Sequence, residues 1–398
     1  MLRLLIENIL DREVKWMVKW KEKTLGKVTS FITKGIPPKY SDYESESTIW
    51  VLNQKCNRNF EISYSDARLH DNNFKKVPEN KMLLDGDVLI NSTGTGTAGR
   101  VAQLQNIQKP TTIDGHMILL RPTDDIDSLY YGYAIKACQS LIEGLAEGST
   151  GQTEINRKRL LDEIIVRYPV DKQKQKAIAC FLSNLDRKIK INVEINNNLV
   201  EQVSALYQSW FEDFELTDGV CPKNWSYQAL STIADIGSGK RPPVKSEVCN
   251  QETPISIVGA ASVMGFTSQP NQTDKILVIG RVGTHGVIQR FNNPCWVSDN
   301  TLVITSNYYE FTNQILHRID YSSMNRGSTQ PLITQGDIKK VVVLVPSEET
   351  IVKFEEFAGS LMAKWETNTK ENEKLVSLRD TLLPQLMSGE LDVSNIDI

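Results

Sequence analysis

Two long segments of the chain carry apolar residues at alternating spacings of four and three. This pattern is the a/d seam of a coiled coil, so each segment is predicted to be a long helix that pairs with the other. The first helix is expected over Lys172–Phe214, which contains no glycine or proline, and the second follows Pro346. Pro384 lacks a backbone N–H and is expected to kink or end the second helix. The seam positions are Ile178, Leu182, Leu185, Ile189, Asn192, Asn196, Leu199, Val203, Leu206 and Trp210, then Phe354, Ala358, Leu361, Trp365, Asn368, Asn372, Leu375, Arg379, Leu382 and Leu386.

Asparagine occupies the fifth and sixth positions of both seams. If the helices lie antiparallel with their ends aligned, Asn192 faces Asn372 and Asn196 faces Asn368. A buried polar layer costs stability, but it penalises slipped registers that would place these amides against leucine. We therefore predict an antiparallel pair with a polar middle. The alternative is that these asparagines lie at a solvated rim.

The region before each helix is repeated. Four landmarks recur in the same order, namely Trp20–Pro38 and Trp225–Pro243, Asp87–Gly99 and Lys275–Gly286, Gly148–Ile155 and Gly327–Ile333, and strand-like runs ending at Pro169 and Pro346. The first pair aligns at an offset of 205, which places Leu25 on Leu230 and Pro37 on Pro242. Such self-similarity predicts two copies of one structural unit.

These patterns together predict an α+β fold. Two similar mixed domains, each with a β-sheet core, would be separated by two long antiparallel coiled-coil helices, with a pseudo-twofold internal repeat. The expected division is an amino-terminal extension (1–19), a first domain (20–168), a central helix (169–221), a second domain (222–345) and a distal helix (346–398).

Composition narrows the class of protein. The 398 residues are 40% hydrophobic and 24% charged, with a net charge of −4, which fits a soluble globular chain rather than a uniformly basic one. The acidic excess lies in 169–221 and 346–398, so the two domains are where an anionic ligand is tolerated. No apolar run approaches the roughly 18 residues that cross a bilayer, and no signal peptide is recognisable. We expect a cytoplasmic protein without membrane contact.

No catalytic or metal-binding motif is present. The sequence lacks a phosphate loop, a dinucleotide fingerprint, an HExxH helix and a GxSxG elbow. Its six cysteines form no CxxC pair, so neither zinc knuckles nor a disulfide framework is indicated. A recognition protein is therefore predicted in preference to an enzyme.

The order of these elements resembles the specificity (S) subunit of type I restriction-modification systems. In both, two variable domains open with Trp-x4-Leu, end in a strand and proline, and are each followed by a long helix. The runs LYQSWFEDF (Leu206–Phe214) and LRDTLLPQLMSGEL (Leu378–Leu391) resemble the ends of the central and distal helices of that family. The resemblance covers residues 20–398 in order and leaves the role of 1–19 open.

The resemblance implies a DNA-recognition subunit without catalytic residues of its own. Each domain would recognise one half of a split, asymmetric site in double-stranded DNA. The helices would set the spacer and dock two methyltransferase subunits, and restriction or translocase subunits would join. The complex would be a type I deoxyribonuclease and adenine-N6 methyltransferase. S-adenosylmethionine, ATP and Mg²⁺ would be bound by partner subunits, and this chain would bind no cofactor.

The DNA-contact candidates are short polar side chains and cations on turns that the repeat places in equivalent positions. Such groups bind phosphates, while arginine and glutamine also pair with guanine and adenine. Solvated charged loops, ordinary hairpin turns and helix caps are the alternatives, and Tyr40 either stacks on bases or packs. The candidates are Lys34, Lys39, Tyr40, Ser92, Thr93, Thr95, Thr97, Arg100, Thr150 and Gln152, then Lys240, Arg241, Arg281, Thr284, His285, Thr329 and Gln330.

Two other functions compete with DNA recognition. A protein-interaction scaffold would use the same domains to bind polypeptides and would show no sequence-selective retention on DNA. A single-chain enzyme with an unrecognised motif would modify or cut DNA without partner subunits.

Overall fold

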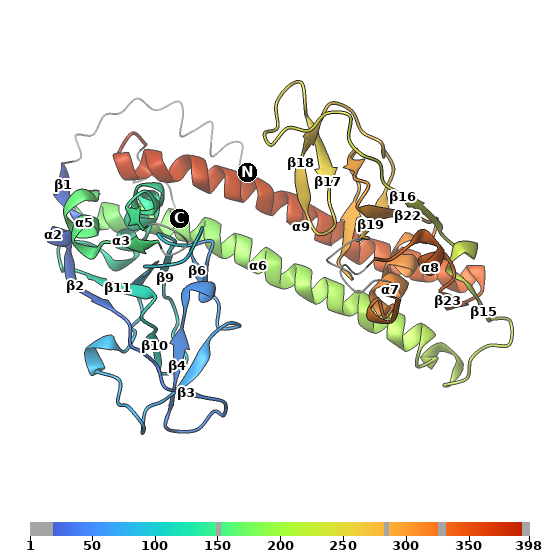
Figure 1. Cartoon of the computed structure of the whole chain (residues 1–398), viewed down its shortest axis with the longest axis horizontal. Helices are drawn as coiled ribbons and strands as arrows, with labels where there is room; N and C mark the ends of the chain where they lie inside the picture. The colour runs from blue at the N-terminus through green and yellow to red at the C-terminus, as the bar shows by residue number, and fades with distance from the viewer. Residues whose placement is uncertain (1–18, 149–152, 282–285, 325–331, 392–398) are drawn as a thin grey trace. The chain divides into compact units, whose positions relative to one another are not determined.

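A computed structural model describes residues 19–148, 153–281, 286–324 and 332–391 (Figure 1). The chain divides into two compact units. Unit 1 comprises Met1–Ile191 and Asn372–Ile398, and unit 2 comprises Asn192–Glu371. Each long helix therefore contributes one part to each unit.

Unit 1 is built around a four-stranded antiparallel sheet. Its strands, in sheet order, are β2 (Thr29–Lys34), β11 (Met117–Pro122), β8 (Val88–Asn91) and β9 (Val101–Gln103). Successive side chains of a strand point to opposite faces, so Ile118 and Leu120 enter one core cluster while Met117 and Leu119 enter another. The unbroken apolar run of β11 thus reflects burial on both faces of the sheet.

Smaller elements complete unit 1. A second sheet has the order β10 (Thr111–Ile113), β4 (Thr48–Leu52), β7 (Arg68–Asp71) and β3 (Tyr40–Ser41). Two-stranded pairs are β1 (Trp20–Thr24) with β14 (Ile165–Pro169), β5 (Asn57–Arg58) with β6 (Glu61–Ile62), and β12 (Ala146–Glu147) with β13 (Glu154–Ile155). The short helices are α2 (Leu25–Val28), α3 (Ser128–Ala137), α4 (Gln139–Glu143) and α5 (Arg157–Glu163).

Unit 2 repeats this plan. Its main sheet has the order β16 (Asp235–Ser238), β22 (Thr301–Thr305), β19 (Ile276–Gly280) and β20 (Ile288–Phe291). The other strands are β15 (Ser226–Ala229) paired with β23 (Val342–Val345), and a sheet of β18 (Val263–Thr267), β17 (Ile255–Val258) and β21 (Trp296–Val297). The short helices are α7 (Tyr309–Arg318) and α8 (Gln335–Lys339). Central strands again alternate between two clusters, with Leu277 in one and Val278 in the other.

Backbone hydrogen bonds fix the register of the repeat. Leu25 N–H donates to Ile164 O and Leu230 N–H donates to Val341 O, which matches the predicted offset of 205. Further on, Lys34 pairs with Ile118 in the sheet and Ser238 pairs with Leu302 in the same way. The offset there is 204, so the predicted alignment of the two diprolines is one residue out of register.

The long helices are α6 (Lys172–Phe211) and α9 (Glu348–Ser388). The first ends three residues before the predicted Phe214, whose φ of 56° lies in the left-handed region and is therefore not helical. The second continues past Pro384 to Ser388, so Pro384 does not end it, and the alternative expectation of a kink stays a prediction. No helix among the described residues combines the length and apolar character needed to cross a bilayer.

The two helices run antiparallel within each unit (Figure 1). In unit 1 Asn372 donates to Ile189 O at 3.1 Å, and Arg379 contacts Asp186 at 2.7 Å. Residue numbers therefore increase along α9 in the direction in which they decrease along α6. In unit 2 Asn368 Nδ2 donates to Asn196 Oδ1 at 2.9 Å. All seam positions predicted from the 4,3 pattern are buried or half-buried.

The polar layer lies inside the seam. Asn192, Asn196 and Asn368 are buried, and Asn372 is half-buried. Asn192 donates to Glu371 at 2.8 Å, and Asn196 donates to Thr369 Oγ1 at 3.1 Å. Burial of three of these amides argues against a solvated rim.

Candidate nucleic-acid interface

A tight loop follows β8 in unit 1. Asn91 N–H donates to Arg100 O and Gly99 N–H donates to Asn91 O, so Asn91–Arg100 closes as a hairpin. Gly94 has a φ of 116°, and a Cβ there would lie 2.3 Å from Thr97 Oγ1. Only glycine fits that position, because other residues avoid this backbone region. The loop therefore holds a defined shape.

The strand before α5 docks on this loop. Ile155 N–H donates to Ser92 O at 2.8 Å, and Thr93 bridges Glu154. The next residue, Asn156, caps α5 by accepting hydrogen bonds from the N–H groups of Lys158 and Arg159. A capping asparagine is common at a helix start. The cap fixes the backbone of Arg157 and Lys158 at the start of α5.

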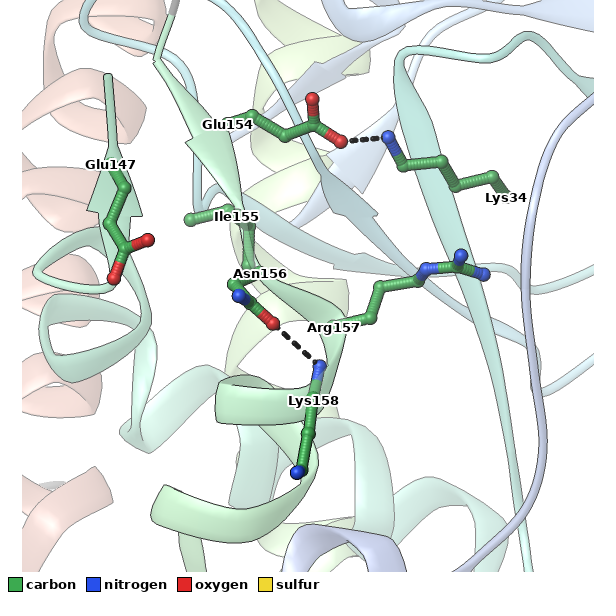
Figure 2. A pocket seen from close by; sticks show the side chains of 7 residues that line it. All are labelled: Lys34, Glu147, Glu154, Ile155, Asn156, Arg157 and Lys158. Atoms are coloured by element: carbon green, nitrogen blue, oxygen red, sulfur yellow. Dashed lines mark hydrogen bonds and ion pairs between the residues drawn. The ribbon is translucent and has the colours of Figure 1, made fainter. Parts of the chain in front are cut away.

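A cavity of about 510 Å³ lies beside this junction. Figure 2 shows its lining residues, which are Lys34, Glu147, Glu154, Ile155, Asn156, Arg157 and Lys158. The ammonium of Lys34, at the end of β2, forms an ion pair with Glu154. The Arg157 side chain extends towards the Lys34 side of the cavity, whereas Glu147 lies on the opposite side (Figure 2).

Some of the cations around the cavity are paired with carboxylates and others are not. Arg159 is paired with Glu147 and Glu163. Arg157 and Lys158 are exposed, and no ion pair joins either of them to another residue within the described ranges. Lys81 donates to Gly35 O at 3.0 Å, and its pKa lies below the usual value because burial disfavours the cation and Arg157 repels it. The local surface is cationic and suits an anion.

Unit 2 has the same construction with different residues. Ile333 N–H donates to Arg281 O at 3.1 Å, as Ile155 does to Ser92. Thr334 caps α8 in place of Asn156 and shares a reciprocal capping box with Asp337. Gln335 Nε2 donates to Ser238 Oγ at 2.6 Å. By these registers Ser238 corresponds to Lys34, Arg281 to Ser92 and Gln335 to Arg157.

The structure gathers some of the predicted contact residues of unit 1 and separates others. Lys34, Ser92 and Thr93 lie at the junction, and Thr95 is exposed on the loop. Ser92 is fully buried and therefore is not the surface donor that the sequence predicted.

Thr97 and Arg100 belong to the same loop. Thr97 is half-buried, and the Arg100 guanidinium donates to Gly96 O at 3.2 Å. Both side chains thus face the loop's own backbone in this structure, and a role in DNA contact stays a prediction.

Lys39 and Tyr40 belong to the other sheet of unit 1. Lys39 lies 5.3 Å from the Phe74 ring, and the Tyr40 ring lies against the Arg68 guanidinium. Tyr40 is therefore packed on one side, while 42% of its surface remains exposed.

The cationic candidates of unit 2 lie on the turn after β16 and directly after β19. Lys240 and Arg241 have exposed side chains, and the Lys240 backbone is anchored by Val297 O and by the Trp296 indole N–H. Arg281 is half-buried. The remaining candidates, Thr150, Gln152, Thr284, His285, Thr329 and Gln330, lie outside the described residues.

Sequence reasoning missed four residues at the unit 1 junction. Glu154, Arg157 and Lys158 line the cavity, and exposed His116 hydrogen-bonds Thr93 Oγ1 at 2.8 Å. A signal for two of them was present, because Arg157 and Lys158 directly follow the Gly148–Ile155 landmark. Nothing in the sequence placed His116 near Thr93. The described residues contain no group of His, Cys, Asp and Glu side chains able to hold a metal ion.

Comparison with known proteins gives a consistent result. Residues 17–201 match the family model described as type I restriction modification DNA specificity domain. The chain is 25% identical to the type I restriction enzyme MjaIX specificity subunit of Methanocaldococcus jannaschii, over 96% of this chain and 94% of that protein. It is 20% identical to the type I restriction enzyme HindI specificity subunit of Haemophilus influenzae, over 94% of this chain and all of that protein.

A solved structure shares the fold. The type I restriction-modification system S subunit from M. genitalium superposes with a TM-score of 0.59 at 19% identity, over 94% of this chain and 98% of that one. The likeness confirms the predicted α+β architecture of two sheet-containing domains with long helices.

Proposed function

We propose that this chain, whose predicted resemblance to type I specificity subunits is confirmed, is the DNA-recognition subunit of a type I restriction-modification complex. Each domain recognises one half of a split site in double-stranded DNA. The observation that carries the proposal is the duplicated junction, in which the residue after β8 or β19 accepts a backbone hydrogen bond from the residue just before a capped helix.

Differences between the two junctions imply an asymmetric site. Lys34 and Ser92 of unit 1 correspond to Ser238 and Arg281 of unit 2. Cations and amides pair with different base edges, and the major groove distinguishes all four base pairs. Two half-sites of different sequence follow, so the complete target is not palindromic.

The helices serve as the separator and as the partner surface. A rigid element between two recognition domains sets how many base pairs lie unread between the half-sites, as dimer geometry does in other DNA-binding proteins. The Asn196–Asn368 contact favours one register of the pair and therefore one spacer length. Exposed apolar residues on α6, including Val193, Ile195 and Val200, suit the docking of a methyltransferase subunit.

The chemistry belongs to the partners. S-adenosylmethionine is used by two methyltransferase subunits, and ATP and Mg²⁺ by restriction or translocase subunits, within the cytoplasm. This chain binds none of these cofactors and is not catalytic by itself. Its acidic helices would face protein, which leaves the domain surfaces for DNA and makes DNA binding by the isolated chain weak.

Co-expression with the methyltransferase encoded nearby, followed by mapping of methylated adenines across a plasmid library, tests the proposal. The expected result is one split motif with two unlike halves and a fixed gap. Thr93→Ala should alter or weaken recognition of one half, and Gln335→Ala should affect the other half. Formation of a complex without any methylated motif would contradict the proposal and favour a protein-interaction scaffold.

A further inference from the structure

Unit 1 concentrates positive charge at the start of α5. The cluster contains Arg157, Lys158, Arg159 and Lys34 around the cavity, with Lys81 close enough to Arg157 for mutual repulsion. Three carboxylates oppose these five cations, and they already pair with Lys34 and Arg159. Arg157 and Lys158 are thus the cations whose charge is available to a ligand.

The equivalent positions of unit 2 carry no positive charge. Because Ile155 corresponds to Ile333, Arg157 and Lys158 correspond to Gln335 and Gly336. Arg159 corresponds to Asp337, whose carboxylate is engaged in the cap of α8. Gln335 is hydrogen-bonded to Ser238, the counterpart of Lys34. The repeat therefore preserves the backbone of this junction while removing its charge.

We propose that Arg157 and Lys158 form a DNA phosphate site of unit 1 that unit 2 lacks at the equivalent junction. The inference rests on the proposed function and extends it, because it assigns the two half-sites different modes of backbone contact. Unit 2 has exposed cations elsewhere, among them Lys240 and Arg241 in the turn after β16. In unit 1 the counterpart of Lys240 is Ile36, which is buried.

The geometry suits a phosphate diester. Arg157 extends towards the Lys34 side of an open cavity, and Glu147 lies on the far side (Figure 2). An anion bound by Arg157 would offset the repulsion between that guanidinium and the Lys81 ammonium. The site adjoins the Ser92–Gly99 loop through the Ile155–Ser92 hydrogen bond, so a phosphate held there lies beside the loop predicted to meet DNA. Phosphate contacts position a protein on the duplex without carrying sequence information.

The test uses the co-purified complex and a labelled duplex containing its mapped site, with the dissociation constant measured across a salt series. Each neutralised phosphate contributes about 0.9 to the slope of log affinity against log salt. Arg157→Gln with Lys158→Gln should lower that slope by about 1 to 2 and weaken binding roughly tenfold at moderate salt. The methylated motif should stay the same, because these residues do not recognise bases.

Two matched variants sharpen the result. Lys27→Gln on α2 removes one positive charge elsewhere in unit 1 and should leave the slope unchanged. Gln335→Arg introduces a cation at the equivalent position of unit 2 and should raise the slope. Equal slopes for the wild-type complex and the double variant, with site-specific binding intact, would overturn the phosphate site alone. Loss of site-specific binding in the wild-type complex would instead contradict the proposed function.

Discussion

Asn368 donates a 2.9 Å hydrogen bond to Asn196 across the helix pair of unit 2, and both side chains are buried. Asn196 Nδ2 also donates to Trp365 O and to Thr369 Oγ1. The Asn196 amide thus makes three hydrogen bonds to the partner helix. A slipped register would remove this contact and leave amides against apolar residues. The Asn196–Asn368 pair therefore favours one register of the two helices over slipped ones.

Replacing one member of this pair should cost more than replacing both. Asn368→Leu leaves the Asn196 amide with one partner fewer in a buried position, which costs about 1–3 kcal/mol of unfolding free energy. The double change to leucine removes both polar groups and should recover much of that loss. Urea unfolding of the four proteins in a double-mutant cycle measures the coupling. Additive effects of the two single changes would contradict a direct Asn196–Asn368 contribution.

The double leucine variant should also lose its preference for one register. A seam without the polar layer tolerates slipped pairings. In the assembled complex, the methylated motif should then appear with more than one spacer length, whereas the wild type gives one. A single unchanged spacer in the double variant would show that other contacts set the register.

The pKa of Lys81 should respond to Arg157. Burial lowers this pKa first and repulsion by Arg157 lowers it further, so Arg157→Gln should move it upwards towards the usual lysine value. NMR titration of the lysine side-chain resonances in the full chain measures the shift. Lys158→Gln is the control, because Lys158 is not among the groups that shift Lys81. Equal pKa values in wild type and Arg157→Gln would show that Arg157 does not lie near Lys81.

Gly389 should not tolerate a side chain. Its φ is 75°, and a Cβ would lie 2.6 Å from the Trp20 ring, which is the first landmark of the repeat. Gly389→Ala combines backbone strain with displacement of Trp20 and should destabilise unit 1 by about 2–4 kcal/mol. Gly219→Ala is a matched control, because that glycine has a φ of 78° with no atom within 4 Å of its Cβ position. Thermal unfolding should show a clearly smaller loss for Gly219→Ala, and equal losses would exclude the Trp20 clash.

Asp186 should anchor the first domain to both helices. It accepts a hydrogen bond from Tyr133 Oη of α3 at 2.5 Å and contacts Arg379 of α9 at 2.7 Å. Asp186→Ala leaves the Tyr133 hydroxyl and part of the Arg379 guanidinium without this acceptor, at a cost of about 1–3 kcal/mol. Denaturant unfolding checks the loss. Asp380→Ala, which removes the other carboxylate bound to Arg379 but is exposed, should cost less.

The helix seam was predictable because its signal is local and periodic. Every position of the 4,3 pattern from Ile178 to Leu386 is buried or half-buried, because spacing along a helix decides which side chains share a face. Pro384 was harder to interpret. A proline removes one backbone donor and need not end a helix near its last turn, and here packing of Leu383, Leu386 and Met387 into the core of unit 1 accompanies its continuation to Ser388.

Spacing and self-similarity along the chain were enough to predict the repeat, the two long helices and the antiparallel sense of their pairing. Tertiary contacts, in contrast, determine which side chains meet at the junction beside α5. Ser92 is buried although its neighbours suggested a surface donor. His116 joins the junction from one stretch of chain, and Arg157 and Lys158 join it from another. Strand pairing brings these residues together, and one sequence does not reveal which strands are neighbours in a sheet.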